Sequence, residues 1–567
     1  MARYVENAPP KRQGAKTLSL FSSLRTTFYQ GEPPKLPEPP FPDDRPSIYR
    51  ALQARREAAG ESYPLPPFEL PDERRRTQEE AARWAPGALD GVMSHHMGIG
   101  EPGEGLEGLL ETARRACRAP SVEAFLAVHA ATPQDSALQV LDPFLEGLLA
   151  DDPNLEAYVD LATWLATESP DREPAKLGVA MLGSLTGIDP EIFLTFGSHD
   201  EFGLVAAVAL ARREDTEEAD RLLWLMARMT QGWGRVNAVE RMSEQPPPEV
   251  ARWLLREGFR NEIMTEYLAH PCATKGGLLA ALSSQTVDQG LLLGAAEILD
   301  ALVRGGPAPG MADYDDGAEA AARYLAVERS AQPGDLRRFM AMNTLREFAA
   351  GEPEDHAELE ALGWTPGMRR RLVAEADDLM ADPRWEAIVR RGLDSDDGVM
   401  FWHAAEIAPR YGIDVWAVRF ARQREGRGDS QWWHLAETED EARMAELVAL
   451  FREQIDLAPL AGEPAMEMGL GTDWADAAAL ENIVRGLGWF PGLGWPLIET
   501  ALKSPVIRSR NVAAQSLSEW PRDFWPAEAE PALKAAAQVE PEEGARVRME
   551  RVLAGLPPDE PPAAGSA

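Results

Sequence analysis

Two short motifs in this chain of 567 residues carry residue types that can bind cofactors or metals. The first, GIGEPG from Gly98 to Gly103, has the glycine spacing of a dinucleotide-binding turn. Such a turn needs a buried strand before it, and the preceding GVMSHHM is a poor strand. Glu101 would also place a negative charge where the pyrophosphate binds. We therefore interpret this motif as a loop between helices.

The second motif is the adjacent pair His95 and His96, with Asp90 just upstream. Imidazole nitrogens ligate metals, but adjacent side chains on a helix point about 100° apart and cannot share one ion there. In a loop the two rings could converge. The sequence contains neither HExxH nor CxxC to complete a zinc site. The pattern favours histidines in a loop or at a helix cap, and it predicts no metal.

Two aspartate-rich turns have the carboxylates of a calcium loop but not its spacing. An EF-hand loop needs ligands at positions 1, 3 and 5, glycine at 6 and glutamate at 12. Neither turn keeps this register, so both are interpreted as turns that precede helices. They contain Asp313, Asp315 and Asp316 in ADYDDG and Asp394, Asp396 and Asp397 in DSDDG.

The other common catalytic motifs are missing from the sequence. It has no phosphate-binding lysine loop, no nucleophile elbow and no kinase set. The sequence therefore predicts no catalytic residue and no cofactor, and a non-enzymatic role is the favoured class.

Aromatic residues are the remaining candidates for contacts with a partner. Most of the 16 tryptophans are expected in the core or between helices. Trp432 and Trp433 are adjacent, and adjacent residues on a helix cannot both face one stripe. This pair is therefore expected to be partly exposed, where aromatic side chains make good interface anchors.

The net charge of the chain favours some classes of binding partner over others. Asp and Glu total 93 against 57 Lys and Arg, which gives a net charge of −36. An acidic surface keeps a protein soluble or attracts a basic partner. It disfavours nucleic acid, because that binding depends on Lys and Arg displacing counterions from phosphates.

Cysteine usage and hydropathy indicate a soluble, cytoplasmic protein without membrane contact. Cys117 and Cys272 are too few for a disulfide framework or a zinc knuckle. The N-terminus lacks an apolar run of the signal-peptide type, and no apolar stretch reaches 18 residues. The oligomeric state is left open.

Apolar spacing predicts an all-α fold. From about residue 76, apolar residues recur at three- and four-residue steps, as in Leu106, Leu109 and Leu110. Runs with period two are nearly absent, so a sheet is not expected. Pairs of a short polar residue and proline indicate helix starts, because the first caps the helix and the second fits its first position. They begin at Thr132, Asp142, Asp152, Ser169, Asp189, Thr365, Asp382 and Ser504.

The two ends of the chain differ from this helical body. Residues 1–75 are rich in proline and predict an extended arm, with one strand between Thr17 and Tyr29. The first 30 residues are basic, so the arm either lies along the acidic body or reaches a separate acidic surface. Residues 557–567 predict a disordered tail.

Several helical segments share a finer pattern. In VIRSRNVAAQSLSEW, Arg510 precedes an alanine pair and then Leu517. Similar orders follow Arg235 (Ala238, Val239, then Met242) and Arg338 (Ala341, Met342, then Leu345), and weaker copies without the arginine include Ala206, Ala295 and Ala404 in their small pairs. Small residues at adjacent positions let two helices pack closely.

This spacing resembles the inner helix of HEAT-type repeats over about residues 190–520. The copies recur at irregular intervals, where a regular array would keep one period of roughly 40–47 residues. The resemblance implies an irregular, HEAT-like α-solenoid of helical hairpins. The expected segments are a helical region at 76–190, a solenoid at 191–423 and a C-terminal HEAT-like region at 424–556.

A solenoid of this kind implies a scaffold or adaptor that holds a basic protein on its acidic helical surface. The composition, rich in Ala, Arg, Glu and Gly, is typical of a bacterial protein. The alternative is a nucleic-acid enzyme, because the HEAT-like alkylpurine DNA glycosylases use a concave basic face with aromatic and acidic residues. For that alternative the residues to inspect are Trp233, Arg235, Trp402 and His403 and the basic stretches 369–371 and 508–510. Candidate binding residues for either class are Trp233, Arg235, Trp402, His403, Trp432 and Trp433.

Overall fold

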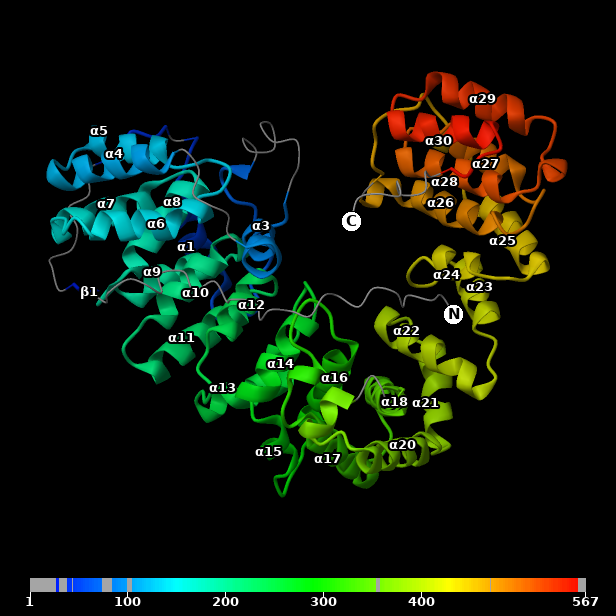
Figure 1. Ribbon diagram of the computed structural model, residues 1–567, viewed down its shortest axis with the longest axis horizontal. Coiled ribbons are helices and arrows are strands. Elements are labelled where there is room, and N and C mark those ends of the chain that lie inside the picture. Colours follow the sequence, from blue (N-terminus) through cyan, green and yellow to red (C-terminus); the bar gives the residue numbers. More distant parts are fainter. Residues whose placement is uncertain are drawn as a thin grey trace. The chain divides into compact units, whose positions relative to one another are not determined.

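The computed structural model describes residues 27–29, 38–42, 44–73, 84–98, 105–352, 357–469 and 471–558 (Figure 1). The regular structure of these residues is almost entirely helical, which confirms the predicted all-α class. The chain divides into two compact units, the first ending at Asp382 and the second beginning at Pro383. This division falls within the segment 191–423 of the predicted domain organisation.

Unit 1 contains one two-stranded parallel pairing and a long series of helices. The strands are β1 (Thr27–Phe28) and β2 (Leu185–Thr186). The α-helices are α1 (Ile48–Ala59), α3 (Ala88–Val92), α4 (Leu106–Arg118), α5 (Val122–Ala131), α6 (Leu138–Leu149), α7 (Leu155–Glu168), α8 (Arg172–Gly183), α9 (Pro190–Gly197), α10 (Gly203–Ala211), α11 (Thr216–Met229), α12 (Trp233–Glu240), α13 (Pro248–Trp253), α14 (Glu266–Lys275), α15 (Leu278–Leu282), α16 (Gln289–Arg304), α17 (Gly317–Ser330), α18 (Leu336–Ala350) and α20 (Pro366–Met380). Single turns of π- or 3-10 helix are η1 (Met93–Met97), η2 (Asp200–Phe202), η3 (Leu254–Gly258), η4 (Met311–Asp313) and η5 (Ala357–Leu362).

Unit 2 is built in the same way. Its α-helices are α21 (Arg384–Leu393), α22 (Gly398–Ile407), α23 (Val415–Glu425), α24 (Trp432–Ala436), α25 (Glu441–Gln454), α26 (Ala475–Leu487), α27 (Trp495–Leu502), α28 (Ile507–Glu519), α29 (Ala529–Val539) and α30 (Glu543–Leu553). Its 3-10 turns are η6 (Ala408–Tyr411), η7 (Ala458–Leu460), η8 (Thr472–Trp474) and η9 (Arg522–Phe524).

Helices in both units pack on the next but one helix along the chain. In unit 1, α8 contacts α10, and the series continues through α12, α14, α16, α18 and α20 (Figure 1). The intervening helices pack among themselves, with α9 on α11 and α15 on α17. In unit 2, α24, α26, α28 and α30 form one such row and α27 packs on α29. Apolar stripes at helical spacing therefore bury against both a sequence neighbour and the helix beyond it.

The arginines of the recurrent motif have one role in all three copies. Each guanidinium is buried and donates to a carbonyl in the turn that leads into its own helix. The bonds are Arg235 to Thr230 (3.0 Å), Arg338 to Gln332 (3.1 Å) and Arg510 to Ser504 (2.8 Å). We name these three residues the turn arginines. Thr230 and Ser504 are buried, so Arg235 and Arg510 satisfy carbonyls that would otherwise lack a donor, while Gln332 is exposed.

Two of the turn arginines also form buried ion pairs. Arg338 donates from Nε to Glu328 Oε1 at 2.7 Å, and Arg510 donates from Nη2 to Glu540 Oε1 at 2.6 Å. Both members of each pair are buried. Removing one member of such a pair costs more than the pair contributes, because the other charge stays buried.

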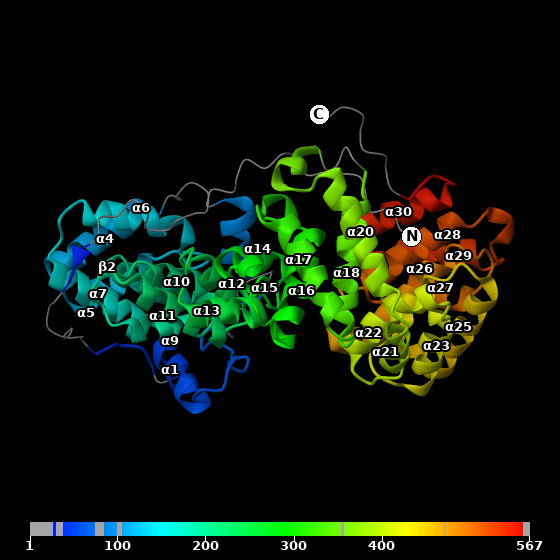
Figure 2. The same ribbon diagram turned by 90° about the horizontal axis from the view of Figure 1, so that it is seen from below.

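The N-terminal arm lies along unit 1 wherever it is described. Tyr29 N–H donates to Thr186 O at 3.0 Å beside the β1–β2 pairing, so part of the predicted strand is present. The prediction of an extended arm did not include α1, a 12-residue helix capped by Ser47 that packs on α7 and α9 (Figure 2). Arg45 binds Asp171 at 2.7 Å and Arg50 binds Glu168 at 2.6 Å. The basic residues of the first 30 positions lie outside the described residues, so these two ion pairs concern only the later part of the arm.

Replacing Arg338 by Met is expected to lower the free energy of unfolding by about 3–5 kcal/mol, because Glu328 would keep a buried charge without a partner. Adding Glu328→Gln should recover part of that loss. Equilibrium urea unfolding of the full chain measures both. The control is Arg371→Met, which removes an exposed pair with Glu375 and should cost less than about 1 kcal/mol. Equal losses in the two arginine variants would contradict the proposed role.

Candidate functional site

Two of the candidate binding residues in unit 1 lie in the core. Trp233 is buried, with ring centroids of His95 and Tyr267 at 5.0 Å and 5.2 Å. Arg235 is buried too, and besides Thr230 it donates to Ala227 O at 2.8 Å. Both side chains are therefore structural and do not offer a surface to a partner.

The histidine pair lies on a helical turn, η1, where a loop or a cap was the favoured interpretation. His95 Nε2 lies 3.0 Å from Glu240 Oε1, and His96 Nε2 lies 2.5 Å from the Tyr267 hydroxyl. The two rings therefore have different hydrogen-bond partners, although both pack against the ring of Tyr267. Among the described residues, no group of three or more His, Cys, Asp and Glu side chains is arranged to hold a metal ion.

The remaining chemical motifs have structural roles or lie outside the described residues. Asp313 accepts from Gly310 N–H at 2.8 Å, and Asp397 caps α22 by accepting from Val399 N–H at 2.9 Å. Both therefore stabilise turns that precede helices, as predicted. Of GIGEPG, only Gly98 belongs to the part of the chain that the structure describes.

The other candidate residues lie in unit 2, and two of the four are exposed. Trp402 and Trp433 are 45% and 47% exposed. His403 is partly buried, and its Nδ1 lies 2.7 Å from Val399 O. Trp432 is buried in the core of unit 2 against Phe451. The adjacent indoles therefore face opposite sides of α24.

Large apolar side chains are exposed mainly in unit 2. Ten of the fourteen in the described residues lie there, although unit 2 is only about a third of the chain. They are Val399, Trp402, Trp433, Met466, Met468, Trp489, Phe524, Val539, Val547 and Leu556. Concentrated exposed apolar area of this kind marks interaction sites on soluble proteins.

One part of this surface is aromatic. Trp489 is 80% exposed and lies in the turn after α26, just before the sequence FPGLG. Arg485 lies one helical turn before it, and its guanidinium is 5.6 Å from the centroid of Trp433. We name Trp433, Arg485 and Trp489 the aromatic surface. Trp and Arg are the side chains that most often dominate binding energy at protein interfaces.

A second part of this surface is a groove of about 680 Å³ between α27 and α29. We name it the α27–α29 groove. Its walls are mostly small or apolar: Gly462, Pro464, Leu502, Ala527, Pro531, Ala532, Ala535, Ala536 and Val539, with Glu499, Lys503 and Glu528 completing the lining. Val539 is 62% exposed, so the apolar wall continues onto the open surface.

Unit 1 contains the densest group of buried charges. Lys176 Nζ lies 2.9 Å from Asp90 Oδ2, 2.8 Å from Glu201 Oε1 and 3.4 Å from Glu173 Oε1. On the same helix, Arg172 binds Asp72 at 2.8 Å and Glu73 at 2.5 Å. We name these seven residues the buried ion network. It connects the arm, α3, α8 and η2. The cavity beside it has a volume of only about 30 Å³, so the network holds these segments together and leaves no room for a ligand.

Two cations face five carboxylates in the buried ion network, and the pKa values reflect this excess. Burial raises the pKa of Glu173 to about 7 against the attraction of Lys176, and the charge of Asp90 adds to the rise. Burial alone would lower the pKa of Lys176, but the surrounding carboxylates, led by Asp90, hold it well above its usual range. Lys176 therefore stays charged while Glu173 takes up a proton near neutral pH.

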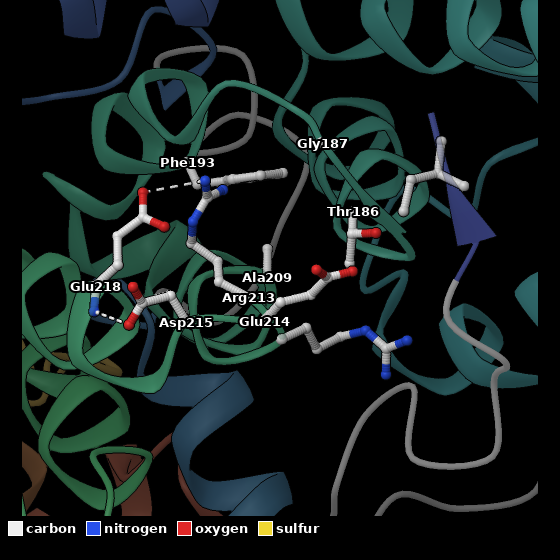
Figure 3. A pocket seen from close by; sticks show the side chains of 10 residues that line it. Thr186, Gly187, Phe193, Ala209, Arg213, Glu214, Asp215 and Glu218 are labelled. Atoms are coloured by element: carbon white, nitrogen blue, oxygen red, sulfur yellow. Dashed lines mark hydrogen bonds and ion pairs between the residues drawn. The ribbon is translucent and has the colours of Figure 1, made fainter. Parts of the chain in front are cut away.

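A further pocket of about 250 Å³ lies beside β2 (Figure 3). Arg213 on its wall points toward Glu218 and binds it at 3.1 Å (Figure 3). Glu218 N–H donates in turn to Asp215 Oδ1 at 3.1 Å. Arg213 and Glu218 pair with each other, and the rest of the lining carries both signs of charge in Arg212 and Glu214, so the pocket does not define the chemistry of a ligand.

Comparison of the chain with protein-family models, with curated proteins and with solved structures gave no match. Among the described residues, every helix is too short or too polar to span a membrane. The exposed apolar surface of unit 2 is therefore the candidate site.

Replacing Glu173 by Gln is expected to flatten the pH dependence of stability. The native pKa of Glu173, about 7, lies above the value of about 4.5 for the unfolded chain, so the native state binds more protons between them. Stability therefore falls as pH rises from about 4.5 to about 7, by about 3 kcal/mol in total, and the loss is complete above that pH. The substituted amide has no charge to bury, so the variant should match the wild type near pH 5 and exceed it near pH 8.

Urea unfolding from pH 5 to pH 8 measures this difference. Burial also raises the pKa of Asp200, to about 6, and this carboxyl contributes to the slope of both proteins. Subtracting the variant curve from the wild-type curve therefore isolates Glu173. Parallel curves would contradict the assignment.

Proposed function

We propose that the chain is a protein-interaction scaffold whose unit 2 binds a basic protein partner. The observation that carries this proposal is the concentration of exposed aromatic and aliphatic side chains in unit 2. Leaving Trp489 almost fully in water costs free energy unless another molecule covers it. The buried ion network of unit 1, in contrast, has too small a cavity to admit a substrate.

The packing pattern supports the finer fold that we propose, an irregular HEAT-like α-solenoid. Contact between every second helix is what stacked helical hairpins produce. The turn arginines recur at the starts of such hairpins, with the small pairs buried behind them. Extended scaffolds of this type commonly bind other proteins, although the fold alone does not define a partner.

Charge supports a basic partner. From Pro383 onward, 31 Asp and Glu residues face 19 Lys and Arg residues. Several of the basic side chains are already paired, as with Arg510 and Glu540 or Arg443 and Asp414. A basic partner would be attracted at long range and released by salt.

The nucleic-acid alternative has no comparable support. Of its two basic stretches, Arg510 is buried against Glu540, and Arg508 donates to Gly469 O at 3.0 Å. In the other stretch Arg369 donates to Ala349 O at 3.1 Å, and Arg371 binds Glu375. Side chains committed to these contacts are poorly placed to displace counterions from a phosphate backbone.

Full-length chain used as bait in its native lysate is expected to retain a basic protein at about 50 mM salt and to lose it at about 300 mM salt. Mass spectrometry identifies what is bound. Retention that does not change with salt, or recovery of nucleic acid in place of protein, would contradict the proposal.

Replacing Trp489 by Ala is expected to weaken retention of that partner about tenfold or more, because an exposed Trp anchor contributes much of an interface. The matched control is Trp84→Ala, since Trp84 is 52% exposed but lies in unit 1. A binding titration of the purified partner measures both variants. A larger loss for the Trp84 variant would move the binding surface out of unit 2.

A further inference from the structure

We infer that the α27–α29 groove binds an amphipathic α-helix with small apolar side chains on one face and Lys or Arg along its edges. This inference rests on the proposed function and names the form of the partner at one place on unit 2. Its basis is the shape, composition and charge of the groove.

The shape of the groove suits a helix. Pro531, Ala535 and Val539 follow one another at four-residue steps along α29 and form one wall. They span about 12 Å, roughly two helical turns. Small side chains on this wall let a second helix approach closely, and Leu502 from α27 provides apolar contact on the other side. Grooves of this kind bind helices through apolar residues at three- and four-residue spacing.

The segment that closes one side of the groove extends the apolar surface. Gly462 N–H donates to Lys503 O at 2.8 Å, which fixes this segment to the end of α27. The same segment continues to Met466 and Met468, and both are exposed. Methionine side chains adapt to different apolar partners, which is why helix-binding surfaces use them.

Charge determines which helix fits. Glu499 and Lys503 on the wall bind each other at 2.7 Å and neutralise one another. Glu528 on the lining and Glu463 beside Gly462 are exposed, and neither carboxylate forms a hydrogen bond or ion pair within the described residues. The groove therefore has an apolar floor and a negative rim. The complementary helix carries positive charge beside its apolar face.

The probe for this inference is a synthetic, fluorescein-labelled helical peptide with Ala and Leu on one face and Lys elsewhere. A twin peptide carries Glu in place of every Lys. Fluorescence anisotropy with the full-length chain measures both affinities. The basic peptide is expected to bind at least about tenfold more tightly than its twin.

A pair of variants distinguishes binding of the peptide in the groove from non-specific electrostatic binding to an acidic protein. Ala535→Lys places a charge inside the groove, while Val547→Lys adds the same charge at an exposed position of α30 outside it. Ala535→Lys should weaken the basic peptide about tenfold or more, and Val547→Lys less than about twofold. Circular dichroism confirms that both variants fold, and Val539→Lys repeats the test at a second site in the groove.

Each outcome decides the inference. Equal effects of Ala535→Lys and Val547→Lys, or no binding of the basic peptide, would overturn the groove assignment. If the lysate partner is still retained in those cases, only the groove assignment fails and the proposed function stands. If no basic protein is retained at low salt, the proposed function fails too.

Discussion

The structure depends on pairing the polar and charged groups that are buried in the turns between packed helices. A helix that starts inside a packed row leaves carbonyls of the preceding turn away from water, and each needs a donor. Arg235 and Arg510 supply that donor to the buried residues Thr230 and Ser504 from within the following helix, and Arg338 bonds Gln332 in the same position of its own turn. Glu328 and Glu540 are buried beside the guanidinium and form ion pairs with Arg338 and Arg510. Removing either member of such a pair lowers stability, because the other charge stays buried without a partner.

The two units differ in where their charged and apolar side chains lie. In unit 1 the pairing of buried charges extends to the buried ion network, where Arg172 and Lys176 on α8 connect the arm to the helices beneath it. Those charges are enclosed and paired, with carboxylates in excess, and they tie the arm to α3, α8 and η2. In unit 2, large apolar side chains lie at the surface, among them Trp489 and Val539. The buried ion network of unit 1 thus has a structural role. The exposed apolar residues of unit 2 have no such role, and exposed apolar patches mark interaction sites.

Sequence reasoning predicted the helical class but only some of the helix starts. Asp189 and Thr365 cap α9 and α20 as the proline pairs predicted. Asp142 and Pro143 lie inside α6, and Thr132 ends α5, because burial of an apolar face outweighs a cap worth about 1 kcal/mol. The sequence could not predict that Trp233 is buried, because its burial depends on helices that are distant in the chain. The α27–α29 groove needs the spacing of two helices, which no local pattern encodes.

The most direct test of the account is hydrogen–deuterium exchange of the full-length chain, alone and with the basic protein that it retains from lysate. Exchange reports protection peptide by peptide and requires no substitution. The account predicts that protection on binding concentrates between residues 462 and 539, around Trp489 and the α27–α29 groove. Protection confined to residues before Pro383 would contradict it, because the exposed side chains of unit 2 would then have no part in binding.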